Sequence, residues 1–122
     1  MKSLSLAENA LSNSEKKFKE LTDLLPQTIF ESDINGEITY FNKNGISLFG
    51  YSEEDLKNHL NIFSLLSEND RERALSNFRL LLREELNPDN LYTGVKKDGS
   101  AIPLQIFSRP IIVNGKSTGI RG

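Results

Sequence analysis

The chain has 122 residues, a net charge of −2 at pH 7 and no cysteine. This length accommodates one domain of ordinary size and is too short for two. The scattered basic residues argue against nucleic acid as the main partner, and the lack of cysteine excludes disulfides and thiolate metal sites.

No apolar run approaches the roughly 20 residues of a membrane span. The N-terminal MKSLSLAENALSNSEKK is polar and interrupted, unlike a signal peptide. We therefore expect a cytoplasmic segment without membrane contact, which leaves open a membrane-associated parent protein.

The first 25 residues carry an apolar stripe with alternating spacings of three and four, which predicts an amphipathic helix over residues 1–25. Its members are Leu4, Ala7, Leu11, Ser14, Phe18, Leu21 and Leu25. The helix either lies on its own domain or pairs with a second copy as a parallel coiled coil. For a homodimer, the candidate interface residues are Leu4, Leu11, Phe18, Leu21 and Leu25. Pro26 bars the helix from continuing.

Residues 28–51, TIFESDINGEITYFNKNGISLFGY, predict a strand, a tight turn, a second strand and a short helix. Asn35-Gly36 suits the positive φ angles of a two-residue hairpin. Asn42 is a predicted N-cap, because its side-chain oxygen can accept a free backbone N–H. Gly50 can end the helix in the left-handed conformation.

Further helices are predicted downstream. Ser52 is a candidate cap for a short helix, and residues 61–66 form a brief helical piece. A longer helix runs from about Glu68 to Leu86, with Ala74, Leu75, Phe78, Leu81 and Leu82 on one face. The sequence Asn87-Pro88-Asp89 breaks it.

The C-terminal third predicts three more strands. Leu91–Lys97 and Ser100–Ile112 are joined by Asp98-Gly99, and Asn114-Gly115 leads into a strand that begins at Lys116. Pro103 and Pro110 each remove an N–H donor, which indicates an edge, a bulge or a strand end. Five antiparallel strands with helices between the second and third predict an α+β fold, with the helices on one face of the sheet.

The ordered set of motifs resembles a PAS domain, a sensory module of bacterial and archaeal signalling proteins. The resemblance rests on the hairpin from Asp33 to Gly36, then ITYFN, LFGY, YSEEDL, NIFSLLSENDR, KKDGSAIPLQI and GKSTGIRG. It implies one five-stranded sheet of order 2-1-5-4-3. It divides the chain into a helix over residues 1–25 and a PAS domain over 26–122. The last strand is expected to be truncated, because similar domains continue it.

The resemblance also implies a cavity between the sheet and the helices, suited to a small, mostly apolar ligand. The candidate lining residues are Phe49, Ile62, Phe63, Leu75, Phe78, Tyr92, Leu104, Ile106 and Glu31. Alternatively, these side chains fill the core at normal density. Glu31 either faces the cavity or, as we favour, faces outward.

No catalytic motif occurs, so we expect no enzymatic activity in this segment. His59 is the one candidate haem or metal ligand. Haem is disfavoured, because haem-binding PAS domains carry their axial His on the long helix, which has none here. Covalent flavin is disfavoured because the light-sensing motif needs a cysteine. Non-covalent flavin has no positive support, and the cofactor stays unknown.

The favoured interpretation is a sensory and relay domain of a multidomain signalling protein, with a sensor histidine kinase as the expected parent. It would bind a small ligand or relay a conformational change to a downstream kinase or other output domain. The alternative is a ligand-free module for dimerisation or protein interaction. A small enzyme or transport protein on a similar frame is the third and least supported class.

Overall fold

A computed structural model describes the backbone of residues 2–85 and 90–122. Side chains are described for residue 10 and from residue 12 onward within these ranges. The side chains of Leu4 and Leu11, the predicted helix end at Leu86 and the predicted break at Asn87-Pro88-Asp89 therefore lie outside the described residues.

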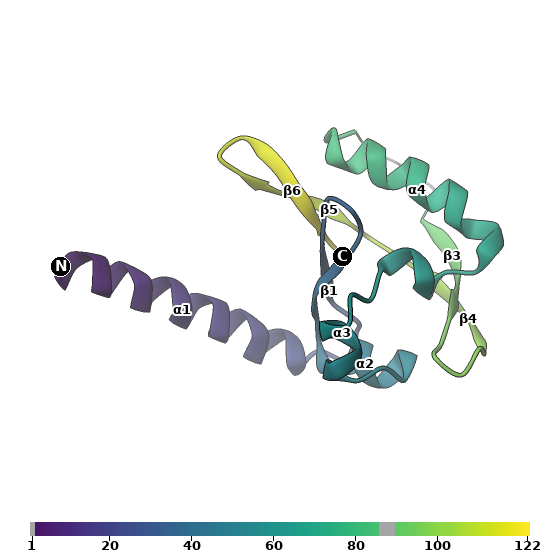
Figure 1. The fold of residues 1–122 in the computed structure, drawn as a ribbon, viewed down its shortest axis with the longest axis horizontal. Coiled ribbons are helices and arrows are strands. Elements are labelled where there is room, and N and C mark those ends of the chain that lie inside the picture. Colours follow the sequence, from purple (N-terminus) through teal and green to yellow (C-terminus); the bar gives the residue numbers. More distant parts are fainter. Residues whose placement is uncertain (1, 86–89) are drawn as a thin grey trace.

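The described residues form helices and strands in an α+β arrangement (Figure 1). In chain order, the elements are α1 (Lys2–Asp23), β1 (Phe30–Asp33), β2 (Ile38–Phe41), α2 (Lys43–Phe49), α3 (Glu53–Lys57), the 3₁₀ helix η1 (Ile62–Leu65), α4 (Glu68–Leu82), β3 (Leu91–Val95), β4 (Ala101–Gln105), β5 (Arg109–Val113) and β6 (Lys116–Arg121). No helix in the described part of the chain combines the length and the apolar character needed to cross a membrane.

Helix α1 touches the rest of the protein through its C-terminal half, while its N-terminal half projects away (Figure 1). The Phe18 ring lies 5.7 Å from the Tyr40 ring on β2, and the Thr22 and Tyr40 hydroxyls are 2.5 Å apart. The helix ends at Asp23, two residues short of the predicted end at Leu25 and before Pro26, which the sequence predicted it would not pass.

The predicted caps are confirmed. The Asn42 side chain accepts the Gly45 N–H at the start of α2, and Gly50 ends that helix at φ 77°. At α3, Ser52 and Asp55 form a reciprocal capping box in which each side chain binds the other residue's backbone N–H. These local signals fix where the short helices start and stop.

The three Gly turns occur where expected, but only one has the predicted two-residue geometry. At Asn114-Gly115 both residues have positive φ, as a type I′ turn requires. At the other two turns only Gly36 and Gly99 do. Carboxylates explain the difference, because Asp33 and Asp98 accept backbone N–H groups further along their own turns and stabilise a different geometry.

The predicted single sheet of five strands, order 2-1-5-4-3, is wrong. The residues that the structure describes form six strands in two sheets, one of order β2-β1-β6-β5 and one of β3 with β4. The predicted strand Ser100–Ile112 divides into β4 and β5, with residues 106–108 between them. The neighbour relations within each sheet agree with the prediction, while the link between β4 and the larger sheet does not form.

Two features account for the division. Strand β6 pairs with β5 only as far as Arg109, so β4 receives no partner from it. Along β4, the bonds Lys96 N to Ser100 O and Ile106 N to Asn90 O fix the alternation of the ladder. By that alternation the Pro103 nitrogen points away from β3, toward the free edge of β4. Because this nitrogen has no hydrogen, it cannot donate to a strand that would pair along that edge.

Apolar side chains from helices and strands form the core on one side of the sheets. Ile38, Phe41, Phe49 and Leu65 are its buried centre, and partly buried side chains such as Ile102 and Leu104 pack against it. On α4, Ala74 and Phe78 are buried, and the Phe78 ring meets the Phe63 ring edge-on at 5.4 Å. The helices between β2 and β3 therefore lie on the core side of the sheets, while α1 packs on the opposite side, against Tyr40.

Candidate functional site

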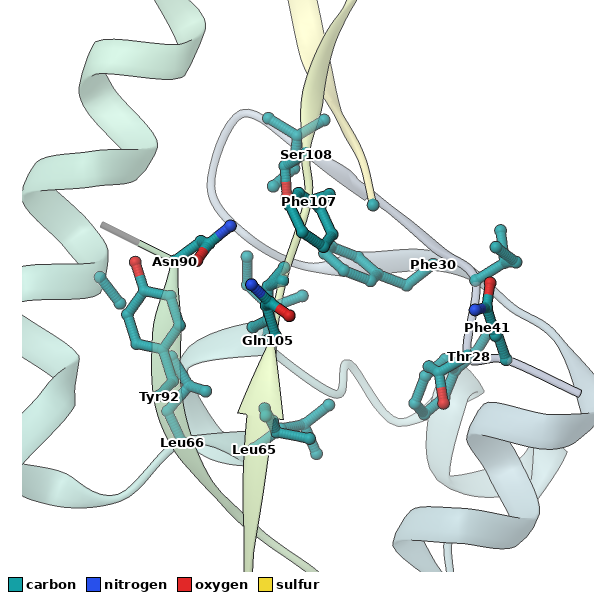
Figure 2. A pocket seen from close by; sticks show the side chains of 18 of the residues that line it. Thr28, Phe30, Phe41, Leu65, Leu66, Asn90, Tyr92, Gln105, Phe107 and Ser108 are labelled. Carbon is teal, nitrogen blue, oxygen red and sulfur yellow. The ribbon is translucent and has the colours of Figure 1, made fainter. Parts of the chain in front are cut away.

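A cavity of about 810 Å³ lies among the sheets, helix α4 and the connector between α1 and β1. Its wall includes Phe30 and Ile120 of the larger sheet, Tyr92 and Leu104 of the smaller sheet, and residues 26–29 of the connector. In the view of Figure 2, Asn90 and Tyr92 lie on one side of it and Thr28 and Phe41 on the other. A volume of this size accommodates a ligand of drug-like dimensions.

Seven of the nine candidates proposed from the sequence line this cavity: Phe49, Ile62, Phe63, Phe78, Tyr92, Leu104 and Ile106. They come from α2, η1, α4, β3 and β4 and from the residue that follows β4. The structure thus brings most of the candidate set together around one space. Leu75 and Glu31 lie elsewhere.

Leu75 is 36% exposed and is not part of the wall. At 100° per residue, Ala74, Phe78 and Leu81 share one face of α4, and position 77 falls on that face while position 75 turns away from it. Asn77 lines the cavity in its place. Applying the same rotation of 100° per residue to the polar residues of α4 would have predicted Asn77 at the cavity.

Glu31 faces away from the cavity, on the opposite side of the sheet. Its carboxylate accepts a hydrogen bond of 2.9 Å from Arg121, the last residue of β6. The Arg121 guanidinium lies 4.5 Å from the centre of the Phe18 ring on α1. The outward orientation favoured from the sequence is correct, and Glu31 joins β1, β6 and α1 on this outer face.

Sequence reasoning missed the connector between α1 and β1. Residues 26–29 line the cavity, and the amide of Asn42 holds this connector in place. That amide accepts the Ile29 N–H at 3.0 Å and donates to Gln27 O at 2.9 Å and to Thr22 O at 2.8 Å. One buried side chain therefore ties the cavity wall to the last turn of α1.

Four polar side chains of the cavity wall form two hydrogen-bonded pairs. The Asn77 amide donates to the Tyr92 hydroxyl at 2.7 Å, and the Thr28 hydroxyl donates to the Asn44 side-chain oxygen at 3.1 Å.

Outside the cavity, the Thr93 N–H donates to the Asp70 carboxylate and holds the pKa of that group below its ordinary value. This bond fixes the start of α4 against β3.

The candidate dimer residues divide into two kinds. Phe18 is engaged within the chain, against Tyr40 and Arg121. Leu21 and Leu25 are 54% and 43% exposed, and Leu24, which was not predicted, is 80% exposed. The leucines at and just after the end of α1 therefore form an exposed apolar surface next to a packed joint.

At that joint, burial raises the pKa of Tyr40, and the nearby Asp23 and Glu31 carboxylates add to the shift.

His59 lies on the surface in the loop between α3 and η1, outside the cavity wall. Its Nδ1 contacts the Glu37 carboxylate, and its backbone has φ 63°. A structural role at this junction accounts for the residue.

These features define an α+β domain in which helices and antiparallel strands border a mostly apolar cavity. The chain belongs to the PAS domain family, because the family's sequence model matches residues 26–122. PAS domains are regulatory, sensory modules. No significant match was found among curated proteins.

Solved structures share the fold at low sequence identity. The PAS domain of a Colwellia psychrerythraea protein has a TM-score of 0.74 at 22% identity, covering 92% of each chain. The PAS domain of an HTR-like protein from Haloarcula marismortui has a TM-score of 0.65 at 17% identity, covering 96% of this chain and 95% of that one. A PAS domain from a two-component sensor histidine kinase has a TM-score of 0.62 at 17% identity, covering 90% and 95%.

Proposed function

We propose that this PAS domain senses a small molecule in the cavity and relays its occupancy to an output domain of a longer signalling protein. A sensor histidine kinase is the parent we favour, and one of the similar structures comes from such a protein. The domain itself regulates and performs no catalysis. The observation that carries the proposal is the cavity of about 810 Å³ with its largely apolar wall.

The route of the signal follows from two joints between α1 and the sheet. At one joint, Phe18 packs on Arg121, which binds Glu31. At the other, Asn42 holds both Thr22 of α1 and the connector that lines the cavity. A ligand that contacts the connector therefore acts on α1 through direct contacts. A relay requires that the ligand bind one position of α1 more tightly than another.

Replacing Ala74 by leucine is expected to abolish retention of a ligand. Ala74 is buried in the cavity wall, so the larger side chain occupies the space that a ligand needs. Native mass spectrometry and an absorption spectrum of the purified domain are expected to show a bound molecule in the unchanged protein and none in Ala74→Leu. Ala10→Leu, the same substitution at an exposed position of α1, is the matched control.

Circular dichroism would confirm that both variants are folded. A domain that carries no additional mass and no absorption band would contradict ligand sensing. Retention of the same molecule by Ala74→Leu would move the site out of this cavity.

The alternative function, a module for dimerisation, is supported by the exposed Leu21, Leu24 and Leu25. If these leucines pair with those of a second copy, sedimentation velocity is expected to show a dimer for residues 1–122 and a monomer for residues 26–122, which lack all three leucines. Replacing Leu21 and Leu24 by glutamate in the full chain is expected to have the same effect. A monomer at all concentrations for the full chain would remove the dimer proposal.

A further inference from the structure

The cavity wall carries almost no formal charge. Among its residues in the described part of the chain, Arg109 is the only one with an ionised side chain, and none is an aspartate, a glutamate or a lysine. The nearby acids Glu31 and Asp70 are engaged elsewhere, with Arg121 and with the Thr93 N–H respectively. The charge inside the cavity therefore depends on where the Arg109 side chain points.

The strand register places Arg109 on the outer face of the sheet. Arg109 on β5 is directly opposite Arg121 on β6, and residues directly opposite each other point to the same face. The Arg121 side chain lies on the outer face, against Glu31 and Phe18. The next pair along, Pro110 with Ile120, points to the other face, where Ile120 is 3% exposed. Arg109 thus borders the cavity without placing its guanidinium inside it.

The polar groups that do line the cavity are neutral. They are amides and hydroxyls, such as the hydrogen-bonded pair of Asn77 and Tyr92 and that of Thr28 and Asn44. Such groups both donate and accept hydrogen bonds, but they provide no counter-charge. The rest of the wall is mainly aliphatic and aromatic.

We propose that the cavity selects an uncharged, mainly apolar molecule with one or two hydrogen-bonding groups, and discriminates against carboxylate, sulfonate or phosphate analogues of the same shape. This inference rests on the proposed sensing function. A charged ligand would lose its hydration on entry without meeting an opposite charge, which is strongly unfavourable. A neutral ligand loses little hydration and gains from burial of apolar surface.

The test uses two fluorescent probes that share one aromatic frame and differ by a sulfonate. They are the neutral N-phenyl-1-naphthylamine and the anionic 8-anilinonaphthalene-1-sulfonate. In fluorescence titrations of residues 1–122, the neutral probe is expected to bind at least about tenfold more tightly, which corresponds to about 1.4 kcal/mol. The signal of the neutral probe is expected to be lost in Ala74→Leu, which assigns it to the cavity.

Placing a cation in the cavity wall is expected to reduce the preference for the neutral probe over the anionic probe. Asn77→Lys adds an ammonium group on the cavity face of α4, so it should weaken the neutral probe relative to the anionic one. Ser76→Lys adds the same charge at the adjacent, exposed position outside the wall and should leave the ratio unchanged.

The outcomes separate the two proposals. If the unchanged protein binds the anionic probe in the cavity as tightly as the neutral one, the charge selection is wrong while the sensing cavity stands. If neither probe binds, both the sensing cavity and its selectivity are contradicted. An equal change of the ratio in Asn77→Lys and Ser76→Lys would also contradict the selectivity, because it would trace the preference to overall charge.

Discussion

Asn42→Ala is expected to lower the free energy of unfolding by about 3–5 kcal/mol. Asn42 is 0% exposed, and its amide makes four hydrogen bonds. It accepts from Ile29 N and Gly45 N and donates to Thr22 O and Gln27 O. Alanine leaves these backbone groups without that partner in a buried place, at a cost of about 1–3 kcal/mol for each group that water cannot reach.

Urea unfolding followed by circular dichroism measures this loss. Asn44→Ala is the matched control on the same helix, because the Asn44 side-chain oxygen accepts a single bond, from the Thr28 hydroxyl. Its expected cost is about 1 kcal/mol. Equal losses in the two variants would show that Asn42 does not hold the joint between α1, the connector and α2.

Features set by neighbouring residues could be predicted from the sequence. Asn42 and Ser52 cap their helices, Gly50 ends one, and Pro26 follows the end of α1. In each case the required chemistry lies within a few residues of the affected backbone. The alternation along Leu91–Val95, with Tyr92 and Gly94 inward, follows from the period of two in a strand.

Features that depend on distant residues were predicted less well. The division of the long strand into β4 and β5 depends on how far β6 runs beside them, which their own sequence does not encode. The Asp33 turn is a local exception, because the Asp33 carboxylate binds backbone N–H groups two and four residues further on, and these bonds compete with the predicted two-residue turn. Pro103 and Pro110 indicated an irregular strand without locating the break.

The candidate site shows the same division. Burial imposes a period on helices and strands, which indicated the apolar face of α4 that carries Phe78. Resemblance to the family then named Phe78, Tyr92 and Leu104 as candidates for the cavity wall, and all three line the cavity. The connector of residues 26–29 has no period, and its place in the wall is set by Asn42, thirteen residues beyond Ile29. Leu75 was wrongly assigned to the cavity wall because it is apolar and adjacent in sequence to Ala74, which does lie on the cavity-facing side of α4.

Gly119→Ala is expected to lower the free energy of unfolding by about 3 kcal/mol or more. Gly119 on β6 pairs with Asp33 on β1, and a Cβ added there would overlap the backbone carbonyl of Ser32. A backbone group in the middle of a sheet cannot turn aside as a side chain can. The added methyl group must therefore separate β6 from β1, which breaks hydrogen bonds of the central ladder and moves Arg121 away from Glu31.

Gly115→Ala separates this steric effect from the general cost of replacing a glycine. A Cβ at Gly115 meets open space, but the residue has φ 78°, so alanine suffers only backbone strain of about 1–2 kcal/mol. Urea unfolding should rank Gly119→Ala as the more damaging change. Hydrogen exchange should show the faster opening at the amides of β1 and β6 in that variant alone. If the two variants lose equal stability, the close approach of β1 and β6 at Gly119 does not limit the packing of the sheet.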